Sequence, residues 1–212
     1  MSAPQSYYVP VDAGEAEFTE KRSRFLGHVR RVETEAEARA FLDEMRKKYY
    51  DARHNCWCYV LHEGDVVRYG DDGEPQGTAG QPMLNVFQRE GAENVVCVVT
   101  RYFGGVLLGA GGLTRAYAKS AKDALDAAGK ARMRLWSAVT VDCPYPMLER
   151  LKLLAAAHGG TVEGTDFGAA VSVRILLPQE NAAGFDAALT ELSAGTMTAR
   201  REGERFLPGP RE

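Results

Sequence analysis

The last third of the chain has an order of elements that few folds accommodate. Residues 135–143 predict a strand, after which Pro144 and Pro146 exclude further strand pairing and favour the start of a helix. A helix, two strands joined at Gly168, a second helix and a final strand follow, over residues 147–157, 161–167, 169–177, 181–192 and 197–203. The order β-α-β-β-α-β is that of the split βαβ, ferredoxin-like sandwich, which we predict here.

The charge distribution divides the 212-residue chain into two parts. Residues 1–137 carry 19 basic and 19 acidic side chains, whereas residues 138–212 carry 7 and 10, which accounts for the formal net charge of −3. We predict an N-terminal domain over residues 1–133 and a ferredoxin-like C-terminal domain over residues 134–212. The nearly balanced charge excludes a uniformly basic nucleic-acid coat but is compatible with a local basic patch.

The first domain is predicted to be a mixed α/β sandwich, so that the whole chain belongs to the α+β class. Thr34 and Glu37 form a capping box, which indicates a helix that begins there. Pro82 indicates the start of a second helix and Gly129 the end of a third, which starts at Leu113. Strands are predicted over residues 24–30, 56–61, 66–69 and 95–100, the middle two as a hairpin.

Two glycine-rich loops in this domain are the strongest candidates for a functional site. Residues 70–82 (GDDGEPQGTAGQP) hold four glycines, and residues 101–112 (RYFGGVLLGAGG) hold five. The second loop lies between a strand and a helix, where unpaired N–H groups suit a phosphate or a carboxylate. Known nucleotide loops do not fit, because Ala110 replaces the lysine of a Walker A loop and Thr114 replaces the last glycine of GxGxxG.

A basic helix face follows the second loop. Arg115, Lys119 and Lys122 are spaced i, i+4 and i+7, and this face is expected to follow a sugar-phosphate backbone while loop aromatics stack on bases. The alternative is a solvated helix face above a tight turn. The predicted ligand- or nucleic-acid-binding residues are Arg101, Tyr102, Gly104, Gly105, Gly109, Gly111, Gly112, Arg115, Lys119 and Lys122.

The carboxylates of the first loop suggest a different chemistry. Asp72 and Glu74, together with Arg101, are candidate catalytic residues for a reaction in which water is the nucleophile. The three carboxylates Asp71, Asp72 and Glu74 also suit magnesium, but their spacing does not match an EF-hand. Ordinary turn chemistry or a structural ion pair with Arg101 or Arg115 is the alternative. We expect no metal site and no cofactor.

His54, Cys56 and Cys58 alternate, so on a strand they share one face. A Cys/His nucleophile pair is conceivable. Core packing is favoured, because free cysteine is among the most frequently buried residues and no third, orienting group is evident.

Four segments resemble the IMPACT/YigZ family. They are KRSRFLG (21–27), DARHNCWCYV (51–60), DDGEPQGTAGQPML (71–84) and VVTRYFGGVLLGAGGLTRAY (98–117). The departures are Gly70, where the family has serine, and Cys58, where it has a smaller residue. The resemblance implies that the first domain is similar to domain IV of elongation factor G and the second to its domain V. Eukaryotic relatives are linked to translational control through the amino-acid-starvation kinase pathway.

Three functions follow from these patterns. The first is a non-enzymatic RNA- or ribosome-binding protein that regulates translation, and the second is an enzyme for a small phosphorylated or carboxylated ligand held between the two loops. The third is a protein-interaction module, with a protein partner in translation control, that exposes apolar residues of the second loop. Whether a reaction is catalysed stays open. With no apolar run of about 18 residues and no signal peptide, we expect a cytoplasmic protein without membrane contact.

Overall fold

The structure is a computed structural model that describes residues 7–212. The chain forms two compact units, one up to Arg132 together with Pro208–Glu212, and one over Met133–Leu207. The predicted boundary between 133 and 134 lies beside this division. The sequence did not indicate that the last five residues return to the first unit, where Arg211 donates hydrogen bonds to the carboxylate of Asp12 and the carbonyl of Ala127.

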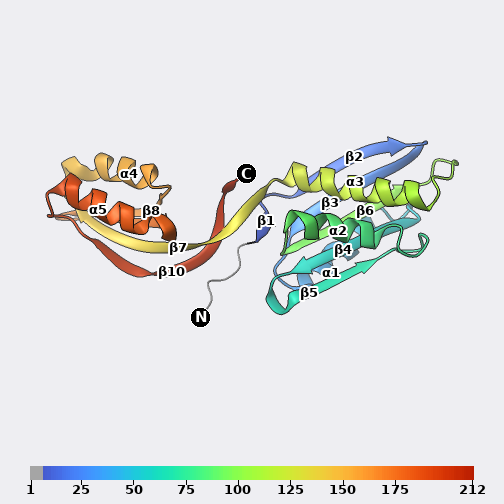
Figure 1. Cartoon of the computed structure of the whole chain (residues 1–212), viewed down its shortest axis with the longest axis horizontal. Helices are drawn as coiled ribbons and strands as arrows, with labels where there is room; N and C mark the ends of the chain where they lie inside the picture. The colour runs from blue at the N-terminus through green and yellow to red at the C-terminus, as the bar shows by residue number, and fades with distance from the viewer. Residues whose placement is uncertain (1–6) are drawn as a thin grey trace. The chain divides into compact units, whose positions relative to one another are not determined.

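An antiparallel sheet of five strands forms the centre of the first unit (Figure 1). Its order is β2-β3-β6-β4-β5, and each strand runs antiparallel to its neighbours. The strands are β2 (Gly14–Glu20), β3 (Ser23–Arg31), β4 (His54–Leu61), β5 (Val66–Gly70) and β6 (Val95–Tyr102). The predicted hairpin of β4 and β5 is confirmed. β2, with its polar, acid-rich sequence, was not foreseen.

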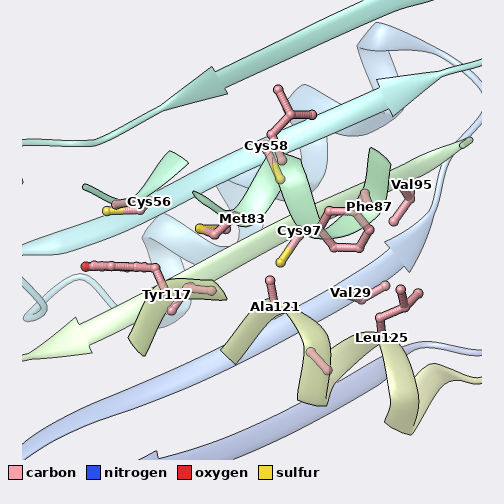
Figure 2. Packing of buried hydrophobic residues seen from close by; sticks show 14 of the residues in the cluster. Val29, Cys56, Cys58, Met83, Phe87, Val95, Cys97, Tyr117, Ala121 and Leu125 are labelled. Atoms are coloured by element: carbon pink, nitrogen blue, oxygen red, sulfur yellow. The ribbon is translucent and has the colours of Figure 1, made fainter. Parts of the chain in front are cut away.

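Helices cover both faces of this sheet, as predicted for an α/β sandwich. On one side lies α1 (Glu35–Lys48), and on the other lie α2 (Gly80–Glu90) and α3 (Ala110–Ala128). Side chains alternate along the strands, so that Cys56 and Cys58 pack toward α2 and α3 (Figure 2), while Tyr59 packs toward α1. α1 begins as expected from its capping box, because the Thr34 side chain accepts a hydrogen bond from the N–H of Glu37.

One helix boundary differs from the prediction in a way that concerns the site. α3 begins at Ala110, one turn earlier than the predicted Leu113, so Gly111 and Gly112 belong to the helix. Its first backbone hydrogen bond runs from the N–H of Leu113 to the carbonyl of Gly109. Glycine disfavours helix interiors, but at the first turn its missing side chain leaves the unpaired N–H groups accessible.

The second unit has the predicted ferredoxin-like fold. The strands are β7 (Lys130–Cys143), β8 (Thr161–Phe167), β9 (Val171–Pro178) and β10 (Ala199–Arg211), and α4 (Leu148–Ala157) and α5 (Ala182–Ser193) pack on one face of the sheet. β7 lies between β10 and β9, and β8 is at the edge. Two strands are longer than predicted. β7 begins at Lys130 because β1 (Tyr8–Pro10) pairs with its first residues, and β10 continues to Arg211.

Within the described residues, no helix combines the length and the apolar composition that crossing a membrane requires.

Candidate functional site

The loop that joins β6 to α3 is the most exposed apolar segment near the predicted site. We call Phe103–Gly109 the tip loop. Leu107 is 82% exposed and Phe103 is 45% exposed. The base of the loop is fixed, because a Cβ at Gly104 would overlap the backbone of Arg22, and Gly109 has φ +72°, which L side chains rarely adopt. The loop therefore presents apolar side chains from a closely packed base.

Behind the tip loop, the two glycine-rich loops meet in a buried polar cluster. Arg101 Nη1 donates to Glu74 Oε1 at 2.6 Å, and the hydroxyl of Tyr117 donates to the same oxygen at 2.8 Å. Arg101 Nη2 also donates to Ser23 Oγ, which accepts a further hydrogen bond from the N–H of Gly104. The side chains of Glu74 and Arg101 are 3% and 6% exposed. We call Glu74, Arg101 and Tyr117 the buried triad, and it ties the base of the tip loop to the first glycine-rich loop.

The other two carboxylates of the first loop bind backbone groups. Asp71 accepts hydrogen bonds from the N–H groups of Gly77, Ala79 and Gly80, which satisfies donors at the start of α2. Asp72 accepts one from the N–H of Asn55 at 2.7 Å. These contacts match the alternative of turn chemistry. Of the three predicted catalytic candidates, the structure brings Glu74 and Arg101 together and directs the Asp72 carboxylate to the backbone of β4.

A hollow of about 350 Å³ lies between the buried triad and the tip loop. We call it the apolar hollow. Its walls come from Phe103, Leu107, Leu108 and Leu113, its polar side from Glu74 and Arg101, and Arg53 and His54 also line it. Although Arg101 is 5% exposed, its Nε has no hydrogen-bond partner among the described residues. Its Nη1 and Nη2 atoms bind Glu74 and Ser23, and the guanidinium lies 5.5 Å from the centroid of the Phe103 ring.

A second hollow, of about 170 Å³, adjoins another side of the start of α3. We call it the cationic hollow, because Lys21, Arg115 and Lys119 line it together with Phe18 and Glu20. Gly112, Ala116 and Leu108 complete the wall, and Leu108 also lines the apolar hollow.

The predicted basic face of α3 is divided by its ion pairs. Lys119 binds Asp123 at 2.5 Å, and Lys122 binds Asp126 and Glu90. The hydrogen bond to Asp126 is the main cause that raises the pKa of Lys122. Asp123 and Asp126 each lie four residues after their lysine, so these two ion pairs could be predicted from the sequence. Arg115 is exposed and has no such partner among the described residues.

Three further basic residues, which are not among the predicted site residues, lie around the tip loop. Lys21 lines the cationic hollow, Arg53 lines the apolar hollow, and the backbone of Arg22 supports Gly104. Within residues 7–212, none of the ion pairs or side-chain hydrogen bonds involves Lys21, Arg22, Arg53 or Arg115. We call these four residues the tip cations. Lys21, Arg22 and Arg53 could have been selected from the sequence, because they lie in the segments KRSRFLG and DARHNCWCYV that resemble the family.

Tyr102 and the remaining predicted glycines complete the surroundings of the loop. The hydroxyl of Tyr102 donates to Asp51 at 2.8 Å, and partial burial together with this hydrogen bond raises the pKa of Tyr102 to about 12. Tyr102 is therefore held to the segment before β4. Gly105 is exposed with φ +82°, and Gly111 is exposed in the first turn of α3.

The cysteines pack in the core, as favoured by the sequence. All four are free and buried. Cys56 Sγ donates to the carbonyl of Asp71 at 2.9 Å, and burial raises the pKa of its thiol well above the usual range. His54 Nδ1 contacts the carbonyl of Asp72 at 2.9 Å. The part of the chain that the structure describes contains no group of three His, Cys, Asp or Glu placed to hold a metal ion.

The sheet face of the second unit that points away from α4 and α5 also carries arginines. It is hollowed by about 420 Å³. Each arginine there has a carboxylate partner: Arg174 binds Asp166, Arg200 binds Asp142 at 3.1 Å and Arg205 binds Glu163 at 2.8 Å. This face is rich in charge but has no excess of positive charge, because Glu202 adds a fourth carboxylate.

Comparison with known proteins supports the two-part organisation. Residues 21–125 match the model of the Impact N-terminal domain, and residues 141–196 match a domain of unknown function, DUF1949. A solved structure described as a hypothetical protein is 32% identical, with a TM-score of 0.59, and the match covers 94% of this chain and 97% of that one.

Two bacterial relatives match over most of their length. The IMPACT family member YvyE of Bacillus subtilis is 36% identical over 200 residues, which are 94% of this chain and 92% of that protein. The IMPACT family member YigZ of Escherichia coli is 35% identical over 180 residues, or 84% and 88% of the two chains. Protein IMPACT of Rattus norvegicus is 32% identical over 112 residues, which are 51% of this chain and 35% of that protein.

Proposed function

Because this chain belongs to the IMPACT family, we propose that it is a cytoplasmic, non-enzymatic protein that binds RNA, including RNA of the ribosome, and thereby regulates translation. The proposal depends on one observation above all. The tip cations surround an exposed loop that carries Phe103 and Leu107, and within residues 7–212 no carboxylate pairs with them. Cations attract a phosphate backbone, while exposed aromatic and apolar side chains contact unstacked bases.

The enzyme hypothesis has one supporting observation, since the two glycine-rich loops adjoin through Glu74 and Arg101. The chemistry of the apolar hollow favours binding instead. Glu74 Oε1 already accepts hydrogen bonds from Arg101 and Tyr117, and the Asp72 carboxylate is directed to Asn55. The described side chains of the hollow offer no nucleophile within hydrogen-bond reach of a base, which catalysis through a side chain requires.

A protein partner is the second candidate. Phe103, Val106 and Leu107 are exposed, and Tyr102 and Leu108 are half-buried, so none of the five apolar or aromatic residues of this segment is fully packed. Exposed apolar residues that adjoin one another mark interaction surfaces. Such a partner would bind through the apolar side chains, and its affinity would depend little on salt.

Sedimentation with ribosomes at low and moderate salt tests the proposal. The tip variant carries Lys21→Ala, Arg53→Ala and Arg115→Ala, and the control variant carries Arg39→Ala, Arg46→Ala and Lys47→Ala on the exposed face of α1, with the same change in net charge. We expect wild type and control to migrate with ribosomes and to dissociate as salt rises, and the tip variant to stay at the top of the gradient. Equal migration of the two variants would refute the assignment of the tip cations.

A further inference from the structure

We propose that the apolar hollow and the cationic hollow are the two halves of one site, which holds a single unpaired nucleotide with its base in the first and its phosphate in the second. This inference rests on the proposed function and specifies the ligand at the same surface. The chemistry that is recognised is a base joined to a phosphate. An unstacked nucleotide of an RNA chain and a free nucleoside monophosphate both supply it.

The two hollows lie on different sides of the first turns of α3 and share one wall residue, Leu108. Gly109, Ala110 and Leu113 line the apolar hollow, whereas Gly112, Arg115 and Lys119 line the cationic hollow. Successive residues of a helix are rotated by about 100°, so the helical members of the two sets lie about 100° or more apart around the axis. Leu108 contributes to both hollows and marks the ridge between them. A ligand that passes over Leu108 therefore reaches both.

The start of α3 supplies anion-binding groups at this ridge. The N–H groups of Ala110, Gly111 and Gly112 precede the first helical hydrogen bond, and no side chain caps this end of the 19-residue helix. Unpaired N–H groups and the helix dipole favour a phosphate there. Lys21 and Arg115 add positive charge, and Arg115 lies close over the first turn, with Nη1 3.6 Å from the position that a Cβ at Gly111 would take.

The walls of the apolar hollow have the chemistry that a base requires. The Arg101 guanidinium lines the hollow and lies 5.5 Å from the centroid of the Phe103 ring, which is 45% exposed. A base offers ring nitrogens and carbonyl oxygens that accept hydrogen bonds, together with flat faces that pack on Phe103 and Leu107. The volume of about 350 Å³ and the apolar walls fit a planar ring, whereas the smaller cationic hollow of about 170 Å³ fits a phosphate.

A pair of substitutions at Gly111 isolates the phosphate half. Gly111 is exposed, its φ is not in the left-handed region, and a Cβ there would meet only Arg115 Nη1 at 3.6 Å. Both Gly111→Asp and Gly111→Asn should therefore fold. The Asp and Asn side chains have nearly the same size, but Gly111→Asp introduces a negative charge at the proposed position of the phosphate. We expect Gly111→Asp to bind a nucleotide about tenfold more weakly than Gly111→Asn, or weaker still.

Titration of the full chain with adenosine monophosphate, adenosine and inorganic phosphate tests the linked site, with backbone amide shifts as the readout. We expect adenosine monophosphate to shift the amides of Gly111 and Gly112 and to bind at least about tenfold more tightly than either half, because the second half binds intramolecularly. Equal affinity for adenosine monophosphate and phosphate, or equal affinity of the two Gly111 variants for the nucleotide, would overturn the inference.

Titration with a single-stranded RNA tetranucleotide distinguishes an RNA chain from a free nucleotide as the ligand of this site. Tighter binding of the tetranucleotide than of adenosine monophosphate, with the same amide shifts, supports an RNA chain as the source, and the reverse order supports a free nucleotide. Binding of RNA that is lost in the tip variant but equal in Gly111→Asp and Gly111→Asn would refute the nucleotide site and leave the proposed function intact. Binding of adenosine monophosphate without any binding of RNA or ribosomes would refute the proposed function alone.

Discussion

The tip of the first unit and the open sheet face of the second unit carry similar numbers of exposed basic side chains, yet their charges are arranged differently. On the sheet face, Arg174, Arg200 and Arg205 each bind a carboxylate. Around the tip loop, the four tip cations have no such partner among the described residues. A paired arginine offers little net charge to a phosphate, so local pairing distinguishes a binding surface from a solvated one better than the count of basic residues.

The largest expected effect comes from substitutions in the buried triad, which holds the base of the tip loop. Arg101→Ala leaves the carboxylate of Glu74 buried without its cation, and we expect a loss of about 3 to 5 kcal/mol in the free energy of unfolding. Urea denaturation measures it. The double variant Arg101→Met with Glu74→Leu removes both charges and should recover most of the loss. A loss below about 1 kcal/mol for Arg101→Ala would mean that the buried triad does not stabilise the loop.

The sheet face should respond much less. Arg174, Arg200 and Arg205 are 51%, 65% and 52% exposed, and exposed ion pairs contribute about 0 to 1 kcal/mol each. Replacing all three by alanine is therefore expected to change stability only slightly and to leave sedimentation with ribosomes unchanged. If this triple variant loses ribosome binding as the tip variant does, the contrast between the two surfaces is wrong.

The smallest expected effect is a loss of stability in acid. It is caused by His28, which belongs to neither surface. His28 is 4% exposed, and burial lowers the pKa of its imidazole, an effect that Glu15 partly opposes. The folded state thus binds fewer protons than the unfolded state, and stability decreases as the pH falls below the ordinary histidine value of about 6.5. We expect His28→Gln to lose less stability between pH 7 and pH 5 in thermal denaturation. Parallel pH profiles for the two proteins would exclude this role.

Local patterns predicted much of the fold. The order of elements predicted the ferredoxin-like second unit, and the alternation of His54, Cys56 and Cys58 predicted that the two cysteines share one face of β4. β2 was missed because its sequence, GEAEFTE, has only a weak apolar alternation. The early start of α3 was missed because glycines indicate loops unless tertiary contacts hold them in a helix. The expected likeness to domains IV and V of elongation factor G stays a prediction.

The site was predicted in part. Arg101 and Glu74 were selected from their loops, but their ion pair joins residues 27 positions apart and required the folded sheet. The neutralisation of Lys119 by Asp123 follows a local spacing and could have been recognised in the sequence. The tip cations come from three separate segments, namely the turn between β2 and β3, the stretch before β4, and α3, and only the fold brings them together around one loop.

The salt dependence of RNA affinity is the most direct test of the central claim, which is that the tip cations bind phosphates. Affinity for a single-stranded RNA is measured over a series of salt concentrations for wild type, the tip variant and the α1 control variant. A plot of log affinity against log salt concentration has a negative slope, and each lost phosphate contact reduces its magnitude by about 0.7. The tip variant removes three cations, so we expect its slope to be smaller in magnitude by about 2 and that of the control to be unchanged. Equal slopes for all three proteins would contradict the account.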